Sequence, residues 1–204
     1  MKKLNNQNKE NITIILMGKS ATGKDYALQK LIEMFRFKPI ISHSTRKRRE
    51  NEVDGKEYYF ISNEEFEKLQ KENEFVEEVS YNVLFENIPS IIHYGISRKE
   101  FQKKGIKICI VDFAGYMTLM NALGKNNMLS IYIHTDSKIR TERAKKRGSF
   151  DEYEWERRLK DDETKFCGER LENFVDYWVD NDNSDGVEQI IEILKQEEII
   201  KENT

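Results

Sequence analysis

The chain of 204 residues is 38% hydrophobic and 11% aromatic, which is enough for one domain with a buried core and too little for two full enzyme domains. Its 34 basic and 37 acidic residues leave a formal net charge of -3, so no overall positive field draws the protein to nucleic acid or to an anionic membrane. No apolar run approaches the roughly 20 residues of a membrane span, and we expect neither a membrane nor a nucleic acid as a partner.

The first ten residues contain lysines but no apolar segment after them, and we expect a short disordered lead-in over 1–10 rather than a secretory signal. Beyond them, short apolar runs bounded by polar residues predict buried strands near residues 12–17, 106–111, 129–133 and 174–179. A helix-compatible segment follows each strand, near residues 24–36, 115–123, 136–147 and 185–198. Strand and helix in alternation predict an α/β fold, with a parallel sheet flanked by helices.

The stretch of residues 40–98 interrupts this alternation. It contains strand-like pieces at 57–61 and 75–81 and one amphipathic helix near 63–72. We therefore expect a mixed α+β subdomain inserted into the α/β core.

A phosphate-binding loop is predicted directly after the first strand. Gly18, Gly23 and Lys24 have the spacing of the motif G-x-x-x-x-G-K-[ST], although Asp25 takes the last position. Such a loop curls its backbone N–H groups around phosphate oxygens, and the helix that follows turns its N-terminus toward the same anion. The other interpretation is an ordinary glycine-rich turn with an exposed lysine. We favour ATP binding, by the residues Gly18, Ser20, Ala21, Thr22, Gly23, Lys24 and Asp25.

Two carboxylates are candidate ligands for Mg²⁺. Asp25 replaces the hydroxyl group that normally contacts the metal in this motif, and a carboxylate can hold Mg²⁺ directly or through water. Asp112 ends the second apolar strand. There it is either a second carboxylate that contacts Mg²⁺-bound water or Lys24, or simply a polar residue at a strand end. We expect Mg²⁺ as the cofactor, with ATP as co-substrate.

Four consecutive basic residues, 46–49, follow Ser42 and precede Tyr58. A run of this kind is usually a solvated loop or a nucleic-acid patch. However, no second basic stretch accompanies it, and arginines beside hydroxyl groups suit two-point binding of one small phosphate. The pattern therefore favours a phosphate clamp.

At this point the sequence resembles the guanylate kinase family, whose segment after the phosphate loop reads Ser-x-x-x-Arg-x-x-Arg-x-x-Glu-x-x-Gly-x-x-Tyr-x-Phe. The matching positions are Ser42, Arg46, Arg49, Glu52, Gly55, Tyr58 and Phe60. The resemblance covers about residues 11–198. It implies that Arg46, Arg49 and Tyr58 bind the phosphate of an acceptor nucleoside monophosphate. It also implies that Ser42 lies near the base of that nucleotide.

Further motifs extend the resemblance toward the acceptor base. Residues 73–77 are similar to the family's N-E-F-x-E, which implies that Glu77 accepts hydrogen bonds from guanine. Tyr94 resembles the tyrosine of the family's Tyr-Gly pair and is implied to bind the phosphate, while Asp112 completes the acceptor site. Tyr94 follows Glu77 at a longer separation than in the family, so we expect an insertion within residues 80–93.

Two departures from the family pattern concern recognition of the base. Ile96 stands where the family has Ser or Thr, and Ala114 stands where the family often has a second Asp. Each change removes a hydrogen-bonding group, so we expect guanine to be preferred only loosely.

Basic residues in the last third of the chain resemble those of the family's mobile lid. Arg143, Arg147 and Arg158 have the spacing of the lid arginines, which implies that they neutralise charge during phosphoryl transfer. Arg158 follows an acidic stretch that looks flexible. Asn181 resembles a residue of the family loop beside the donor adenine. We interpret the remaining basic side chains of this region as parts of an ion-paired surface helix; they are Arg140, Lys145, Lys146 and Arg157.

The resemblance implies a single domain over residues 11–198, with a core at 11–41 and 99–198, an acceptor-binding subdomain at about 42–98 and a helical lid at about 143–160. The expected reaction is ATP-dependent phosphoryl transfer to GMP or dGMP. Two alternatives stay open: a binding module of the same family without catalysis, and a P-loop kinase for another small acceptor. The protein is expected to be a monomer or a homodimer.

The two cysteines, Cys109 and Cys167, have neither the spacing of metal ligands nor that of a disulfide framework. They predict reduced thiols and a cytoplasmic location.

Overall fold

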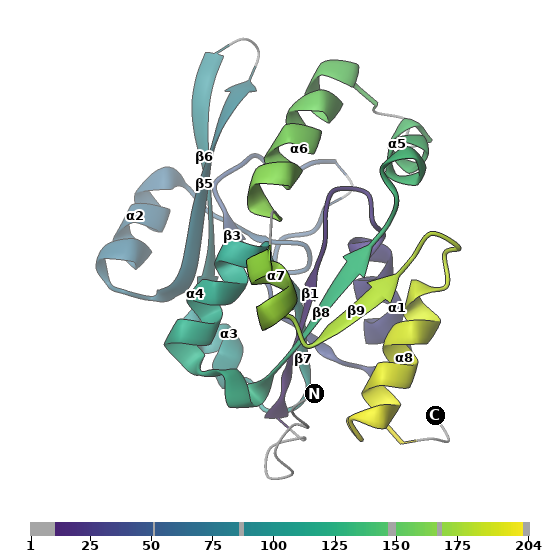
Figure 1. The fold of residues 1–204 in the computed structure, drawn as a ribbon. Helices are drawn as coiled ribbons and strands as arrows, with labels where there is room; N and C mark the ends of the chain where they lie inside the picture. The colour runs from purple at the N-terminus through teal and green to yellow at the C-terminus, as the bar shows by residue number, and fades with distance from the viewer. Residues whose placement is uncertain (1–10, 51, 86–87, 147–149, 167–168, 202–204) are drawn as a thin grey trace.

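Two β-sheets organise the chain, and helices surround the larger of them (Figure 1). A computed structural model describes residues 11–201 apart from 51, 86–87, 147–149 and 167–168. The predicted lead-in at 1–10 therefore lies outside the described residues.

The larger sheet has five strands in the order β2-β7-β1-β8-β9, and all neighbouring pairs are parallel. Its strands are β2 (Lys38–Pro39), β7 (Lys107–Ile110), β1 (Thr13–Met17), β8 (Met128–His134) and β9 (Tyr177–Asp180). In the central register, Leu16 lies opposite Ile110 of β7 and Ile131 of β8. The predicted α/β fold with a parallel sheet is confirmed.

Helices cover both faces of this sheet. Successive side chains of β1 point to opposite faces, so each face needs helices to bury its apolar side chains. Ile14 and Leu16 pack against α1 (Lys24–Phe35) and α8 (Gly186–Gln196). Ile15 and Met17 belong to a second cluster, which includes side chains of α4 (Phe113–Leu123) and α7 (Glu169–Phe174). All residues of β1 are buried, and the strand thus anchors both halves of the core.

The smaller sheet is mixed and has four strands in the order β4-β3-β6-β5. They are β4 (Tyr59–Phe60), β3 (His43–Ser44), β6 (Ile88–Ser97) and β5 (Phe75–Phe85). β5 and β6 form a long antiparallel hairpin that rises beside α2 (Asn63–Lys71) in Figure 1. Phe66 of α2 stacks on Phe75 of β5 with ring centroids 4.6 Å apart, which fixes the helix on the sheet.

The remaining helices are α3 (Arg98–Gln102), the short 3₁₀ helix η2 (Lys125–Asn127), α5 (Ser137–Lys145) and α6 (Glu152–Lys165). The acidic stretch before Arg158 is helical and forms the first part of α6, where the Asp151 side chain accepts a hydrogen bond from the Glu154 amide and caps the helix. Its flexibility stays a prediction. α6 lies between the β5–β6 hairpin and α5 (Figure 1).

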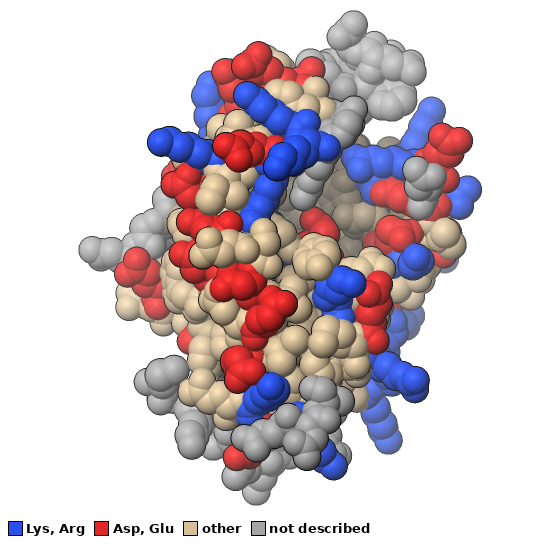
Figure 2. Space-filling model, turned by 90° about the vertical axis from the view of Figure 1, so that its right-hand side faces the viewer, with Lys and Arg blue, Asp and Glu red and all other residues tan. Residues whose placement is uncertain are grey.

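Within the described residues, no helix combines the length and the apolar character that crossing a bilayer requires. On the face in Figure 2, basic and acidic side chains are interspersed, and neither sign occupies a broad area alone. This mixture agrees with the nearly balanced charge of the sequence.

Candidate active site

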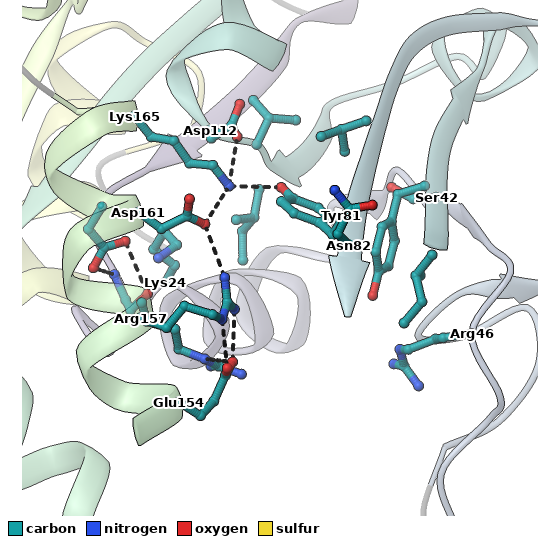
Figure 3. A pocket seen from close by; sticks show the side chains of 18 of the residues that line it. Lys24, Ser42, Arg46, Tyr81, Asn82, Asp112, Glu154, Arg157, Asp161 and Lys165 are labelled. Atoms are coloured by element: carbon teal, nitrogen blue, oxygen red, sulfur yellow. Dashed lines mark hydrogen bonds and ion pairs between the residues drawn. The ribbon is translucent and has the colours of Figure 1, made fainter. Parts of the chain in front are cut away.

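A cleft of about 1220 Å³ opens between the phosphate loop, the smaller sheet and α6. Figure 3 shows Ser42 and Arg46 on one wall and Arg157, Asp161 and Lys165 of α6 on the opposite wall. Many of the residues predicted from the sequence line this single cleft: Gly18, Ser20, Lys24, Ser42, Arg46, Arg49, Tyr58, Glu77, Tyr94, Asp112 and Arg158.

The phosphate loop connects the end of β1 to the start of α1. Gly18 and Gly23 have φ values of 151° and 97°, and an added Cβ at Gly18 would lie only 2.4 Å from the carbonyl oxygen of Ile133. Lys24 folds back over the loop and donates a hydrogen bond of 2.8 Å to the carbonyl oxygen of Lys19. The loop therefore has a curled backbone with a cation across it, which is the form that binds phosphate groups.

Asn181 contacts this loop from outside the cleft, and Arg143 in turn contacts Asn181. The Asn181 amide group donates to the carbonyl oxygen of Thr22 over 2.8 Å and accepts from the Gly186 amide over 2.9 Å. Arg143 donates to the carbonyl oxygen of Asn181 over 2.6 Å and to the Ser184 hydroxyl over 3.0 Å. Neither side chain lines the cleft, and their roles toward ATP stay predictions.

Arg46 is held in place by a residue to which the sequence analysis gave no role. Its guanidinium group makes two hydrogen bonds to the Glu52 carboxylate, of 2.6 and 2.5 Å, and Glu52 also accepts from the Arg49 amide over 2.8 Å. The bonds from Arg46 lower the pKa of Glu52 to about 2. Glu52 stood in the quoted motif, three residues after Arg49, and that position was the available signal.

Aromatic rings form the wall around Arg46. Its guanidinium carbon lies 4.9 Å from the centre of the Tyr58 ring, and Tyr58 lies 5.6 Å from Tyr94, centroid to centroid. Burial raises the pKa of Tyr58, so its hydroxyl group stays protonated and is available as a hydrogen-bond donor. Arg46, Tyr58 and Tyr94 thus bring hydrogen-bond donors to the same wall of the cleft.

Glu77 is a buried carboxyl group at the inner end of the cleft, with 8% of its surface exposed. Burial, followed by the nearby charge of Asp112, raises the pKa of Glu77 to about 7. An added Cβ on Gly115 would lie 3.1 Å from the Glu77 carboxyl oxygen, so the start of α4 passes close to it. Such a group is poised to accept hydrogen bonds from a bound molecule.

Asp112 and Lys165 connect this end of the cleft to α6. Asp112 caps α4 by accepting from the Gly115 amide over 2.9 Å, and its other oxygen lies 3.6 Å from the Lys165 ammonium group. Lys165 also donates to the Tyr81 hydroxyl over 3.1 Å (Figure 3). Lys165 and Tyr81 could not be predicted as site residues, because no local sequence pattern indicates that α6 contacts β5.

Two of the basic residues interpreted as parts of an ion-paired surface helix have different outcomes. Arg157 is exposed on α6 and pairs with Glu154 at 2.7 Å, as predicted; it also lines the cleft beside Arg158, which pairs with Glu154 at 2.8 Å. Arg140 is ion-paired but buried, with 3% of its surface exposed, because it reaches Asp162 beside the phosphate loop. The prediction of a surface position is therefore wrong for Arg140.

The other basic residues of that region divide differently. Lys145 and Lys146 are exposed, as predicted. Arg147 lies outside the described residues, as does Cys167, whereas Cys109 is a buried free thiol.

The residues present fit a magnesium ion that is coordinated by both the protein and the phosphate groups of a nucleotide. Mg²⁺ keeps several waters and takes one or two carboxylates besides the phosphate oxygens. Asp25 is exposed in the first turn of α1, next to Lys24, and is suited to be a carboxylate ligand of Mg²⁺. Asp112 accepts a hydrogen bond from the Gly115 amide and pairs with Lys165, so it is less suited to be a ligand. Among the described residues, no three His, Cys, Asp or Glu side chains gather as a protein-only metal site.

The fold and the loop between β1 and α1 define a P-loop α/β protein with an inserted mixed sheet. The sequence profile of guanylate kinase matches residues 10–201. The guanylate kinase of Aster yellows witches'-broom phytoplasma is 32% identical over 198 residues, which are 93% of this chain and 88% of that protein. The guanylate kinase of Wolbachia pipientis wMel is 32% identical over 200 residues, which are 94% and 93% of the two chains.

A solved structure agrees with these relatives. The crystal structure of guanylate kinase from Anaplasma phagocytophilum superposes with a TM-score of 0.66 at 22% identity, over 95% of this chain and 89% of that one. The chain belongs to the guanylate kinase family.

Proposed function

We propose that the protein transfers the γ-phosphoryl group of ATP to GMP or dGMP. The observation that carries this proposal is the single cleft that Lys24 of the phosphate loop, Arg46 of the segment after β3 and the buried Glu77 carboxyl group all line. Phosphoryl transfer needs no covalent intermediate on the protein, because positioning and charge neutralisation supply most of the catalysis.

The donor phosphates would lie on the phosphate loop, where backbone N–H groups and the N-terminus of α1 favour an anion. Lys24 now donates to the carbonyl oxygen of Lys19 and would turn to the phosphate oxygens. Asp25 would hold Mg²⁺, which neutralises charge on the phosphates when it is bound.

The acceptor phosphate would be bound by Arg46, Arg49, Tyr58 and Tyr94. Glu52 supports this role because it fixes the plane of the Arg46 guanidinium group before any ligand arrives. A preorganised arginine loses less side-chain freedom on binding and therefore binds more tightly. Residues 42–98 would then form the acceptor-binding subdomain.

The acceptor base would lie against Glu77. Guanine offers the carboxylate two donors, the ring N1–H and the 2-amino group, whereas adenine offers neither on that edge. Ile96 is buried and apolar, and Ala114 does not line the cleft, so neither adds a polar contact to the base. Guanine would therefore be preferred, and at least one other base would be accepted at a lower rate.

Arg158 would stabilise the charge that develops during transfer, and residues 143–160 would act as the lid. Arg158 lines the cleft on α6, together with Lys24 and Ser20 of the donor loop. Its ion pair with Glu154 is exposed to solvent and is weak enough to be exchanged for a phosphate group.

A coupled assay that follows ADP release tests this proposal, with Mg-ATP and a panel of ribonucleoside and deoxyribonucleoside monophosphates. Turnover should be highest with GMP or dGMP. Good turnover on another monophosphate without activity on either guanine nucleotide would establish a kinase for a different acceptor. Absence of turnover on the whole panel, with GMP still bound, would establish a binding module.

A further inference from the structure

A buried ion pair joins α6 to the phosphate loop, and neither the family resemblance nor the proposed reaction uses it. Asp162 of α6 and Arg140 of α5 are bridged by a contact of 2.9 Å, and their side chains are 7% and 3% exposed. Asp162 also accepts from the Ser20 amide over 2.9 Å and from the Ser20 hydroxyl over 3.1 Å. The Arg140 guanidinium group in turn donates to the carbonyl oxygen of Ser20 over 3.3 Å.

This arrangement is costly for a contact that only stabilises the fold. Two charges are removed from water, and a buried ion pair seldom outperforms apolar side chains of similar size. In addition, the Nε atom of Arg140 is buried and has no hydrogen-bond partner among the described residues. We therefore ascribe the pair to a different role, which is to hold Ser20 and α6 in fixed positions.

Ser20 precedes the strained point of the loop. Ala21 has a φ of 61°, a left-handed conformation that side-chain-bearing residues rarely adopt and that the surroundings must enforce. Asp162 holds the residue before it, and Asn181 holds the carbonyl oxygen of Thr22 after it. The shape of the phosphate loop is thus clamped from both sides.

The same pair fixes the cleft arginines. Arg158 lies one helical turn before Asp162 on α6, so a helix docked through Asp162 keeps Arg158 at the cleft without a nucleotide. Apolar packing accompanies the docking, since Trp155 of α6, Ala144 of α5 and Ala21 of the loop belong to one buried cluster.

We propose that Asp162 is a positioning residue, which docks α6 on the phosphate loop and holds both the loop and Arg158 in the geometry for transfer. Its effect on turnover rests on the proposed kinase function, whereas its effect on docking does not.

Three variants test the proposal. Asp162→Asn keeps the shape of the side chain, and we expect kcat to fall about 10- to 100-fold with a smaller change in the KM for GMP. The double variant Arg140→Leu and Asp162→Leu restores an apolar contact and should recover the thermal midpoint, but kcat should stay about tenfold low because the Ser20 amide has lost its acceptor. Glu163→Gln is the matched control, because Glu163 also reaches the loop but is exposed, and its kcat should be unchanged.

Docking has a readout of its own. Trp155 is 8% exposed, and in a Trp178→Phe background it is the sole tryptophan of the chain. Its fluorescence emission maximum should lie at short wavelength in the parent protein without nucleotide, as for a buried indole, and should shift to longer wavelength in Asp162→Asn. The proposal is overturned if the double leucine variant has full kcat, or if Asp162→Asn leaves Trp155 emission unchanged. If the parent protein phosphorylates no monophosphate, the proposed function fails, and the emission measurement still decides whether Asp162 docks the helix.

Discussion

The Glu52 carboxylate faces the Arg46 guanidinium group edge to edge, with two hydrogen bonds of 2.6 and 2.5 Å. Because this pairing fixes the orientation of Arg46, its remaining N–H groups have a defined direction toward the cleft. In the proposed acceptor site, Glu52 would therefore orient Arg46, although its own negative charge does not suit it to bind a phosphate.

Substitutions in this pair, and at Arg49, should lower the efficiency with which the acceptor nucleotide is phosphorylated. Arg46→Ala removes a charge-assisted contact, and we expect kcat/KM for the acceptor to fall about 100-fold or more. Arg49→Ala should have a similar effect. Glu52→Gln should raise the acceptor KM about tenfold by loosening Arg46. Lys47→Ala is the control, since Lys47 is exposed and does not line the cleft. If all four variants behave alike, the segment is a diffuse basic patch.

Turnover should depend on pH through Glu77. The pKa of Glu77 is raised to about 7, so the ligand-free protein holds a neutral carboxyl group below that pH and a carboxylate above it. Only the carboxylate accepts both guanine donors, and kcat/KM for GMP should therefore rise with pH toward about 7 and then level off. Guanine donors favour the charged form, so the corresponding rise in kcat should occur at lower pH.

Glu77→Gln checks the assignment of this profile. The variant should lose the rise in kcat/KM near pH 7, and its preference for GMP over AMP should shrink about 10- to 100-fold. A strict guanine preference that survives the substitution would show that another group reads the base.

Lys24→Ala should abolish ATP-dependent turnover while the thermal midpoint stays close to that of the parent protein. The change removes the cation that would face the transferring phosphoryl group. Lys30→Ala is the matched control, because Lys30 lies on the same helix and pairs with Glu33 at an exposed position. Unchanged turnover in Lys24→Ala would refute the assignment of the phosphate loop.

Asp25→Ser should preserve or raise turnover. Serine restores the hydroxyl group that the motif usually offers to Mg²⁺ and removes a negative charge next to the phosphates. A titration of turnover against Mg²⁺ concentration is the measurement. Complete loss of activity at every concentration would mean that the carboxylate is an essential ligand.

Arg158→Ala should lower kcat about 10- to 100-fold and change the KM for either nucleotide much less. An arginine that acts on the transition state contributes little to ground-state binding. Steady-state kinetics with both substrates varied separate the two effects, with Lys145→Ala as a control in the neighbouring helix. A change confined to KM would contradict this role.

The sequence was most informative where one short segment decides the structure. The apolar residues of β1 and the glycines after it determine a buried strand and a curled loop locally, and both predictions of structure hold. The helix near 115–123 was also predicted. Its start at Phe113 follows from the Asp112 cap.

Features that depend on partners far along the chain had no such signal. The expected strand piece at 75–81 became the long strand β5, because it pairs with β6, which the sequence analysis did not predict. α6 is charged on most of its surface, and a pattern of this kind does not distinguish an exposed helix from one that buries Asp162. The partner of Asp162 on the loop is 142 residues away, so only the folded chain brings them together.

The central position of β1 has a consequence for how the site responds to local unfolding. β1 is hydrogen-bonded on both sides, by β7 and β8, and all of its residues are buried. Amide hydrogens in such a strand exchange with solvent only when the whole domain opens, whereas exposed helix ends and hairpin tips open far more often. The donor loop thus begins at the most persistent point of the molecule, and the exposed first turn of α6, about three turns before Asp162, can fray and re-form without disturbing β1.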